Sequence, residues 1–240
     1  MELSISNPFS RHECQRLDLD SWETIIAETY GQRAEDLIVE ALLRVRLFRA
    51  GRSGSDLKYI EIGANHPVVH SSSYLFHKKY GAHGILVEPI PALCEILSRS
   101  RPGDSVVNCA VSASHDETAT LYVARHSALS SLDKDHIKQF SGEGKSIADV
   151  LTVPNLHINS FMEIYAPKII DFLSVDTEGM DLKILQTLDT DRFRPAVIQC
   201  EPGSEFTQII DMFKAKQYVL LATTDVNMLF ADAFSLLGMA

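Results

Sequence analysis

The stretch KYIEIGANHPVVHSSSYLFHKKYGAHGILVEPIP, residues 58–91, contains the features from which the fold is predicted. An apolar strand ends at Gly63, a short helix follows, and a second apolar strand ends at Glu88. A dinucleotide-binding turn begins in the same way, but it continues with two further glycines that let the backbone approach a pyrophosphate. Here that part of the turn contains His66 and Pro67. The pattern therefore favours a nucleoside ligand without a pyrophosphate.

Strand and helix patterns alternate through the rest of the chain, which predicts a parallel sheet with crossover helices. The predicted strands span residues 57–64, 84–90, 105–112, 118–124, 151–158, 169–176 and 195–201, and the predicted helices span 73–81, 91–100, 159–166, 180–189 and 205–217. The end differs, because 218–234 has the pattern of two strands joined by a short turn around residues 225–227, with no room for a crossover helix. We therefore predict an α/β fold in which an antiparallel hairpin closes a mostly parallel sheet.

Two segments lie outside this alternation. Residues 1–50 are predicted to be a helical extension of the main domain, 51–240, and to be available for self-association. Its helix, expected over 21–50, has an apolar face formed by Leu37, Ile38, Ala41, Leu42, Val45 and Phe48. Residues 125–149, named here the cover segment, are too long and too polar for a tight connection. We expect the cover segment to be a mobile loop or a partly helical cover.

The composition is that of an ordinary soluble chain, with 240 residues of which 45% are hydrophobic and 22% charged. The net charge of −10 argues against nucleic acid or an anionic membrane as a partner. The four cysteines are scattered, which indicates neither a zinc ribbon nor a disulfide framework. The sequence has no apolar signal core and no membrane-length apolar run. We expect a cytoplasmic protein that acts on a small or polar organic molecule.

Ligands of open α/β sheets bind beyond the carboxyl ends of the strands. At those ends the chain has Gly63, where backbone can approach a ligand closely, and Glu88, whose carboxylate can accept hydrogen bonds from both ribose hydroxyls. S-Adenosylmethionine has a ribose and an adenine but no pyrophosphate, so it fits this pattern. A nicotinamide-dependent oxidoreductase is an alternative, disfavoured by the missing glycines. A non-catalytic binding protein with the same fold is another.

Several motifs, in order, resemble the FkbM family of S-adenosylmethionine-dependent methyltransferases. They are IEIGAN at 60–65, VEPIP at 87–91, DFLSVDTEG at 171–179 with MDLKILQTLD after it, RPAVIQCE at 194–201 and YVLLATTDVNMLF at 218–230. The resemblance implies a Rossmann-like class I methyltransferase fold of seven strands, the seventh antiparallel. It also implies O-methylation of a hydroxyl on a sugar, a polysaccharide or a glycosylated natural product. Many members have a glycine where this chain has His66.

The resemblance also implies roles for individual residues. The methionine end of the cofactor would be lined by Glu61, Gly63, Ala64 and Asn65, the ribose by Glu88, and the adenine by the segment that includes Asn108 and Ala110. Asp176 and Glu178 would face the reaction centre, with Asp176 also beside the cofactor. Ser72 is a candidate to bind the methionine carboxylate at the N-terminus of the next helix, although serines 71–73 could equally cap that helix.

Asp176 and Glu178 are also candidates from the residues alone. They end a buried strand two positions apart, so they are expected to project from the same face. A carboxylate there could take the proton of an attacking hydroxyl. The alternative is that Asp176 only caps the following helix.

No metal is part of the prediction. Oxygen ligands from Asp176, Glu178 and Glu201 would suit a divalent cation, but nothing in the sequence requires one. His66 and His70 would share a helix face, yet Pro67 argues against a regular helix between them.

Overall fold

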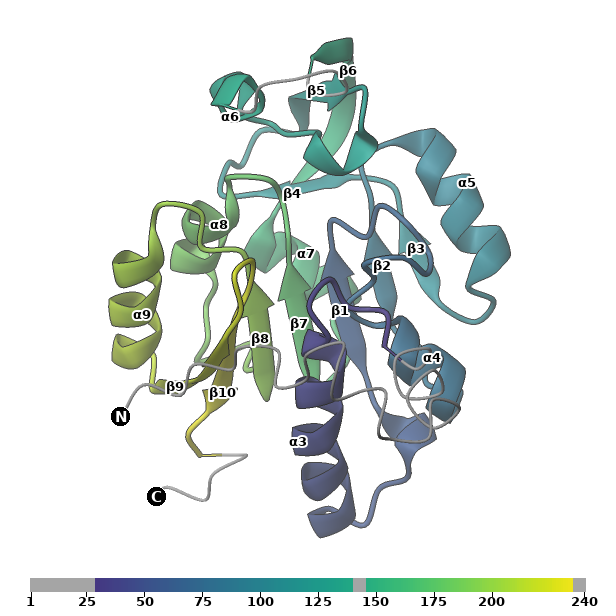
Figure 1. Ribbon diagram of the computed structural model, residues 1–240, viewed down its shortest axis with the longest axis vertical. Coiled ribbons are helices and arrows are strands. Elements are labelled where there is room, and N and C mark those ends of the chain that lie inside the picture. The colour runs from purple at the N-terminus through teal and green to yellow at the C-terminus, as the bar shows by residue number, and fades with distance from the viewer. Residues whose placement is uncertain (1–28, 140–145, 235–240) are drawn as a thin grey trace, which may run out of the picture.

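The structure is a computed structural model that describes residues 29–139 and 146–234. Its centre is a seven-stranded sheet with the order β3-β2-β1-β7-β8-β10-β9 (Figure 1). The strands are β1 (Tyr59–Ile62), β2 (Ile85–Val87), β3 (Ser105–Val107), β7 (Phe172–Val175), β8 (Val197–Cys200), β9 (Tyr218–Thr223) and β10 (Met228–Asp232). β10 is antiparallel to both of its neighbours, whereas the other pairs of the sheet are parallel. This order and its reversed strand confirm the predicted Rossmann-like class I methyltransferase fold.

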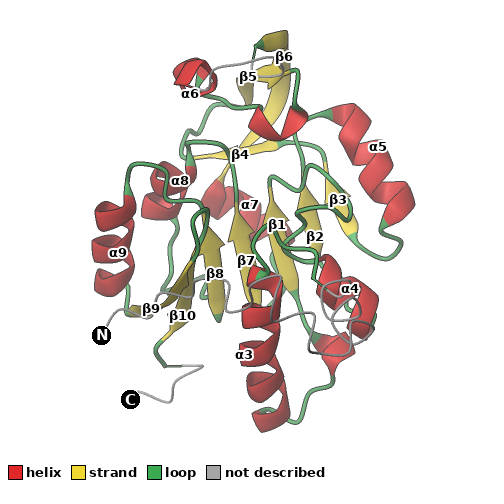
Figure 2. Cartoon of the chain, in the orientation of Figure 1, coloured by secondary structure: helices red, strands yellow, loops and turns green. Residues whose placement is uncertain are grey.

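Helices cover both faces of the sheet (Figure 2). One face carries α3 (Glu35–Arg49), α4 (Tyr74–Tyr80) and α5 (Pro91–Ser100), and the other carries α7 (Ile158–Tyr165), α8 (Asp181–Thr187) and α9 (Phe206–Ala215). Because successive strand residues point to opposite faces, Tyr59 packs in the first core and Ile60 and Ile62 pack in the second. Both sides of the strands are therefore buried, and the carboxyl edge of the sheet remains available for a site.

The extension helix is shorter than predicted, and its buried face differs. The predicted apolar face included Val45 and Phe48, but these side chains are 49% and 86% exposed. The buried stripe instead runs through Val39, Leu43 and Leu47, at intervals of four residues. The apolar pattern covers much of the helix circumference, so it could not specify which stripe meets the sheet. Residues 1–28 of the predicted extension lie outside the described residues.

A second, small sheet lies above the carboxyl ends of the large-sheet strands (Figures 1 and 2). Its order is β4-β6-β5, with β4 (Ala110–Ser112), β5 (Thr118–Ala124) and β6 (Ile147–His157). β6 is long enough to pair with β4 in parallel through residues 155–157 and with β5 antiparallel through most of its remaining length. β6 therefore connects β4, next to the large sheet, to the antiparallel β5–β6 ribbon above it.

The prediction of one strand over 105–112 was wrong, because the chain changes sheets between β3 and β4. Asn108 lies at the break, and its side-chain Nδ2 donates to the carbonyls of Glu88, at 2.9 Å, and Pro89, at 3.1 Å. An asparagine amide that satisfies neighbouring backbone groups favours a turn over a continuous strand. The apolar residues on both sides conceal this break in the sequence.

The cover segment has more regular structure than a loop. It contains a 3₁₀ turn, η2 (Ser127–Leu129), a short helix, α6 (Lys134–Gln139), and the beginning of β6 at Ile147. A second 3₁₀ turn, η1 (Gly54–Asp56), precedes β1. Residues 140–145 of the cover segment lie outside the described residues. Within the described ranges, no helix combines the length and apolar character needed to cross a membrane.

Candidate functional site

A cavity lies at the carboxyl edge of the sheet, beneath the small sheet and the cover segment. The residues that line it come from strand ends and from the cover segment: Ile62, Gly63, Asn65, Val87, Glu88, Pro89, Cys109, Ala110, Val111, Leu121, Ser127, Ala128, Ser130, Ser131, Leu132, Asp176, Thr177 and Glu178. The site thus lies where the fold predicts a ligand.

The turn after β1 has a strained backbone. Gly63 has φ +86°, and a Cβ atom at this position would lie 1.8 Å from the backbone oxygen of Asp176. Asn65 has φ +43°, in the left-handed region that asparagine tolerates better than most residues. Gly63 and Ala64 both donate their N–H groups to the Val87 carbonyl at 3.0 Å. The turn can therefore pass closely between β2 and the end of β7 only with glycine at position 63.

Glu88 lies at the end of β2 and is 4% exposed. One carboxylate oxygen accepts from the Asn65 N–H and the other from the Ile90 N–H, both at 2.9 Å. These bonds fix the plane of the carboxylate, and each oxygen can still accept a further bond. Burial raises the pKa of Glu88 to about 7, and the two backbone hydrogen bonds oppose that rise.

The cover segment is attached to the strand-end turns on both sides of the cavity. Ser127 Oγ donates to Asn65 Oδ1 at 2.9 Å, and Ser131 Oγ donates to the Glu178 carbonyl at 2.6 Å. Backbone hydrogen bonds between Ser131 and Tyr122 tie the same segment to β5. These contacts hold the cover segment over the carboxyl edge of the sheet.

Four acidic side chains, named here the carboxylate cluster, meet beyond the ends of β7 and β8: Asp176, Glu178, Asp181 and Glu201. One carboxylate oxygen from each of Asp176, Glu178 and Glu201 lies within 4.8 Å of the others. Burial is the main cause that raises all four pKa values, with mutual repulsion adding to it for Asp176, Glu178 and Asp181. The rise brings Glu178 to about 8 and Asp181 to about 7. A cation bound here would relieve this repulsion.

The members of the carboxylate cluster have different contacts. Asp181 accepts hydrogen bonds from the N–H and hydroxyl of Thr177 and from the Glu201 N–H. Asp176 Oδ1, in contrast, is buried and has no hydrogen-bond partner among the described residues. Asp181 therefore holds the turn after β7, whereas Asp176, which lines the cavity, has an oxygen available to a ligand. The alternative in which Asp176 caps α8 does not match these contacts.

Glu178 reaches the cavity through an unexpected backbone conformation. It has φ +53°, so it is not in the extended backbone from which its shared face with Asp176 was predicted. Its Oε2 lies 3.0 Å from Nε2 of His136, which belongs to α6. The His136 ring packs where a Cβ on Gly179 would lie, 2.5 Å from His136 Nδ1. A histidine from the cover segment therefore joins the cluster.

The structure brings most of the predicted site residues to one cavity. Gly63, Asn65, Glu88, Ala110, Asp176 and Glu178 line it, and Glu61, Ala64, Ser72 and Asn108 do not. Glu61 lies behind the turn, where its carboxylate accepts from the Ser72 N–H and from the hydroxyls of Ser71 and Ser73. Ser72 Oγ accepts a hydrogen bond from Nε2 of Gln199, which belongs to β8. These two residues support the turn from behind and do not face the cavity.

The cavity also includes residues that the sequence did not indicate. They are in the cover segment, at Ser127, Ser130 and Ser131, and at Leu121 on β5. His136 joins through Glu178. No local pattern identifies them, because their roles depend on how a polar segment folds back over strands that are distant in sequence. His66, by contrast, is accounted for locally: its Nδ1 accepts from the N–H groups of Val68 and Val69, which explains how the turn is built without further glycines.

The comparisons with known proteins agree with this geometry. The family model described as "Methyltransferase FkbM domain" matches residues 61–220, about two thirds of the chain. The chain belongs to the FkbM methyltransferase family. The match includes the turn after β1, Glu88, the cover segment and the carboxylate cluster. No curated protein matches this chain.

Solved structures match this chain at low sequence identity. A methyltransferase FkbM from Methylobacillus flagellatus is 14% identical, with a TM-score of 0.45 over 76% of this chain and 46% of the other. An O-methyltransferase from Bacillus cereus, in complex with S-adenosylhomocysteine (SAH), is 11% identical, with a TM-score of 0.42 over 95% of this chain and 93% of the other. The chain therefore spans about half the length of the Methylobacillus protein.

Proposed function

We propose that this FkbM methyltransferase transfers the methyl group of S-adenosylmethionine to a hydroxyl of a sugar, a polysaccharide or a glycosylated natural product. The observation that supports it most is the cavity in which Glu88 and Asp176 both lie, at the ends of two strands that flank β1. Glu88 suits a ribose, and the buried, unpartnered Oδ1 of Asp176 suits a hydroxyl or a cation.

The cofactor would extend across the carboxyl edge of the sheet. In this arrangement Glu88 accepts hydrogen bonds from the ribose hydroxyls, and the adenine lies against Cys109, Ala110 and Val111, which line the apolar side of the cavity. The methionine portion passes the turn at Gly63 and Asn65, toward the carboxylate cluster. In this arrangement the positively charged sulfonium would lie near Asp176 and Glu178, whose pKa values are raised by burial and by the neighbouring carboxylates.

The chemical step is a displacement at the methyl carbon. The acceptor oxygen forms a bond to the methyl group, the bond from that carbon to sulfur breaks, and the electron pair stays on sulfur to give SAH. The hydroxyl proton would go to Asp176, whose pKa is raised by burial and by neighbouring carboxylates, and a bound sulfonium would favour the ionised form of this carboxylate before transfer. The protein supplies alignment of the reacting atoms and the proton acceptor.

The pKa of Glu88 predicts that cofactor affinity depends on pH. Ribose hydroxyls donate to the ionised carboxylate, so binding lowers the pKa of Glu88 below its free value of about 7. We expect affinity for SAH to be constant above about pH 8 and to weaken below pH 7, by at most about tenfold for each pH unit. Titration calorimetry from pH 5.5 to 8.5 measures this dependence. Glu88→Gln, which cannot ionise, should bind weakly at every pH; a wild-type affinity that does not change with pH would contradict the assignment.

A screen of acceptors tests the substrate class. Purified protein with methyl-labelled S-adenosylmethionine is incubated with monosaccharides, oligosaccharides, glycosides and, as comparison, RNA and non-glycosylated alcohols. The proposal expects label in the sugar-containing acceptors at an oxygen, established by mass spectrometry of the product. Label found only in RNA would contradict the proposed acceptor class and identify RNA as the acceptor. Cofactor binding without turnover on any acceptor would favour the non-catalytic alternative.

Three further predictions stay open. A divalent cation on Asp176, Glu178 and Glu201 is an alternative countercharge to the sulfonium, and calorimetric titration of Mg²⁺ into the free protein tests for it. Cytoplasmic location and self-association through the N-terminal helices remain predictions as well. Light scattering coupled to gel filtration measures self-association.

A further inference from the structure

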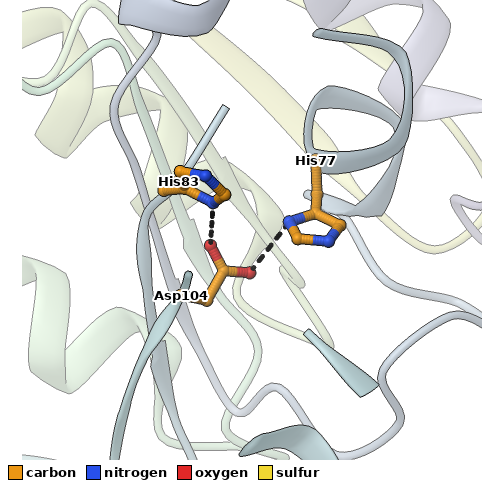
Figure 3. Close-up of side chains that lie close together, drawn as sticks. All are labelled: His77, His83 and Asp104. Carbon is orange, nitrogen blue, oxygen red and sulfur yellow. Dashed lines mark ion pairs between the residues drawn. The ribbon is translucent and has the colours of Figure 1, made fainter. Parts of the chain in front are cut away.

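Two histidines and an aspartate meet at the amino edge of the sheet, opposite the cavity (Figure 3). His77 lies in the last turn of α4, His83 precedes β2, and Asp104 precedes β3. Because β2 and β3 are parallel, the residues before them lie side by side at the end away from Glu88. These residues play no part in the proposed methyl transfer.

The distances among the three side chains suit a shared cation. His77 Nδ1 lies 3.7 Å from Asp104 Oδ2, and His83 Nδ1 lies 3.9 Å from Asp104 Oδ1. One ligand atom from each residue lies within 4.8 Å of the other two. These distances are longer than hydrogen bonds, and ligands at about 2.0–2.2 Å from one tetrahedral zinc are a little over 3 Å apart. Small side-chain adjustments would therefore bring all three onto one ion.

The surroundings hold the aspartate in place, with Oδ1 nearer His83 and Oδ2 nearer His77. Asp104 Oδ1 accepts from the Tyr59 hydroxyl at 2.6 Å and the Gly84 N–H at 2.8 Å. Asp104 Oδ2 and His77 Nδ1 are both buried without a hydrogen-bond partner among the described residues. Oδ2 does have a charged neighbour, since Arg101 Nη2 forms an ion pair with it at 2.8 Å. Carboxylates held by such outer contacts are typical of metal ligands.

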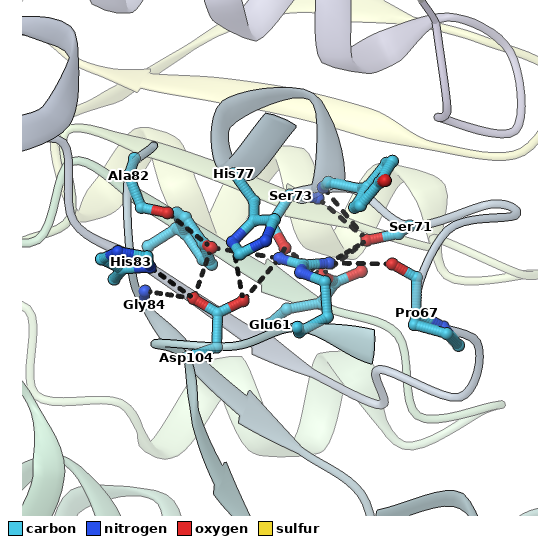
Figure 4. A network of polar contacts seen from close by, with 12 residues as sticks. Glu61, Pro67, Ser71, Ser73, His77, Ala82, His83, Gly84 and Asp104 are labelled. Atoms are coloured by element: carbon cyan, nitrogen blue, oxygen red, sulfur yellow. Dashed lines mark hydrogen bonds and ion pairs between the residues drawn. The ribbon is translucent and has the colours of Figure 1, made fainter. Parts of the chain in front are cut away.

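The charges of the buried network leave room for a further cation (Figure 4). Arg101 is 1% exposed and donates to the hydroxyls of Ser71 and Ser73, which in turn donate to Glu61. Arg101 is thus shared between two buried carboxylates, because it forms an ion pair with Asp104 and is linked to Glu61 through the serines. A buried carboxylate is stable when a positive charge lies beside it, and the imidazoles are its other neighbours.

The position of His83 depends on Gly103. A Cβ on Gly103 would lie 2.4 Å from His83 Cε1, so any larger residue would push the ring away from Asp104. Gly103 also has φ +94°, which favours glycine independently. The ring of His77 is held from the other side by stacking on Tyr74. Burial, with repulsion from Arg101, lowers the pKa of His77.

We propose that His77, His83 and Asp104 bind one divalent transition-metal ion of the zinc class, with water completing its coordination. Imidazole nitrogens select zinc, cobalt or nickel over magnesium and calcium. The ion would tie the end of α4 to the starts of β2 and β3. Through Asp104 and Arg101 it would also be connected to the serines behind the cofactor turn. The proposal does not depend on the methyltransferase reaction.

The test uses the full chain without a histidine tag, freed of metal by a chelator that is then removed. Calorimetric titration with Zn²⁺ is expected to give one site per chain, and Co²⁺ is expected to produce visible absorption typical of low coordination number. Thermal unfolding should move to higher temperature with Zn²⁺, and His83→Gln should lose most of that shift. His83→Gln is the main variant, because that side chain is 48% exposed and its loss leaves no buried cavity.

His83→Gln should weaken Zn²⁺ binding by at least the ~10–100-fold that loss of an outer-shell partner costs a metal site. His115→Gln, which replaces an exposed histidine elsewhere, should bind like the wild type. The proposal would be overturned by the absence of a Zn²⁺ site in folded wild-type protein. It would equally be overturned by a site that His83→Gln leaves unchanged, including one that Glu201→Gln abolishes, because that site would be the carboxylate cluster.

Discussion

Replacement of Asp176 by asparagine is expected to lower kcat by about 10²–10⁴-fold, the range that a positioned general base contributes. The variant keeps the size of the side chain and removes its ability to accept a proton. Asp176 is the member of the carboxylate cluster with a buried oxygen that has no partner and that lines the cavity. Affinity for SAH, which lacks the positive charge on sulfur, should change by less than about tenfold, since Glu88 and the turn at Gly63 are unaffected.

Glu201→Gln is the matched control for this experiment. It also removes one negative charge from the carboxylate cluster, but Glu201 does not line the cavity. We expect its kcat to stay within a few-fold of wild type if proton transfer to Asp176 is what matters. Equal losses in the two variants would instead assign the effect to the summed charge of the cluster, and unchanged turnover in Asp176→Asn would remove Asp176 from the mechanism. Steady-state kinetics with labelled methyl donor measures all three proteins.

Gly63→Ala is expected to abolish detectable cofactor binding and to lower the free energy of unfolding by about 3–5 kcal/mol, at the upper end of single-residue effects. Its Cβ would lie 1.8 Å from the Asp176 carbonyl oxygen, a backbone atom that cannot move without displacing the end of β7. The same displacement would shift Asp176 and Glu178. Urea unfolding and calorimetry with SAH measure the two effects separately.

Gly81→Ala separates the steric clash from the conformational strain. Gly81 has φ +61°, also in the left-handed region, but a Cβ there would meet nothing within 4 Å. It should cost only about 1 kcal/mol, because the left-handed penalty is partly offset by the lower entropy of the unfolded chain. It should also bind cofactor normally. If Gly63→Ala behaves like Gly81→Ala, the close approach of the two strand-end turns is not a requirement of the site.

The sequence predicted the large sheet well because its strands are short apolar runs that end in polar or glycine residues. That pattern is sufficient to locate β1, β2, β7 and β8, and with them the places of Gly63, Glu88 and Asp176 at one edge. The reversed β10 also followed from the sequence, since the link before it is too short for a crossover helix. These are local properties of the sequence. Because the strands are parallel, their carboxyl ends lie at one edge of the sheet, and the residues that follow them lie close together there.

The remaining features depend on contacts between segments that are distant in the chain. Glu61 was expected in the cavity because it is part of the family motif IEIGAN. In the structure, three serines ten or more residues later hold its carboxylate behind the turn. His136 was not indicated at all, because only the fold of the cover segment brings it to Glu178. The split of 105–112 into β3 and β4 was hidden by apolar residues on both sides of Asn108. In each case the local sequence allowed more than one conformation, and a contact with a distant segment determined which one forms.

The two halves of β6 have different neighbours. Its last residues pair with β4 next to the core, whereas its first residues pair with β5 above the cavity. Under the proposed function, an exchange of the β5–β6 ribbon between two family members would also change the wall of the cavity, because Leu121 on β5 and Ser127 beyond it line that cavity. Acceptor preference and cofactor affinity would therefore change together.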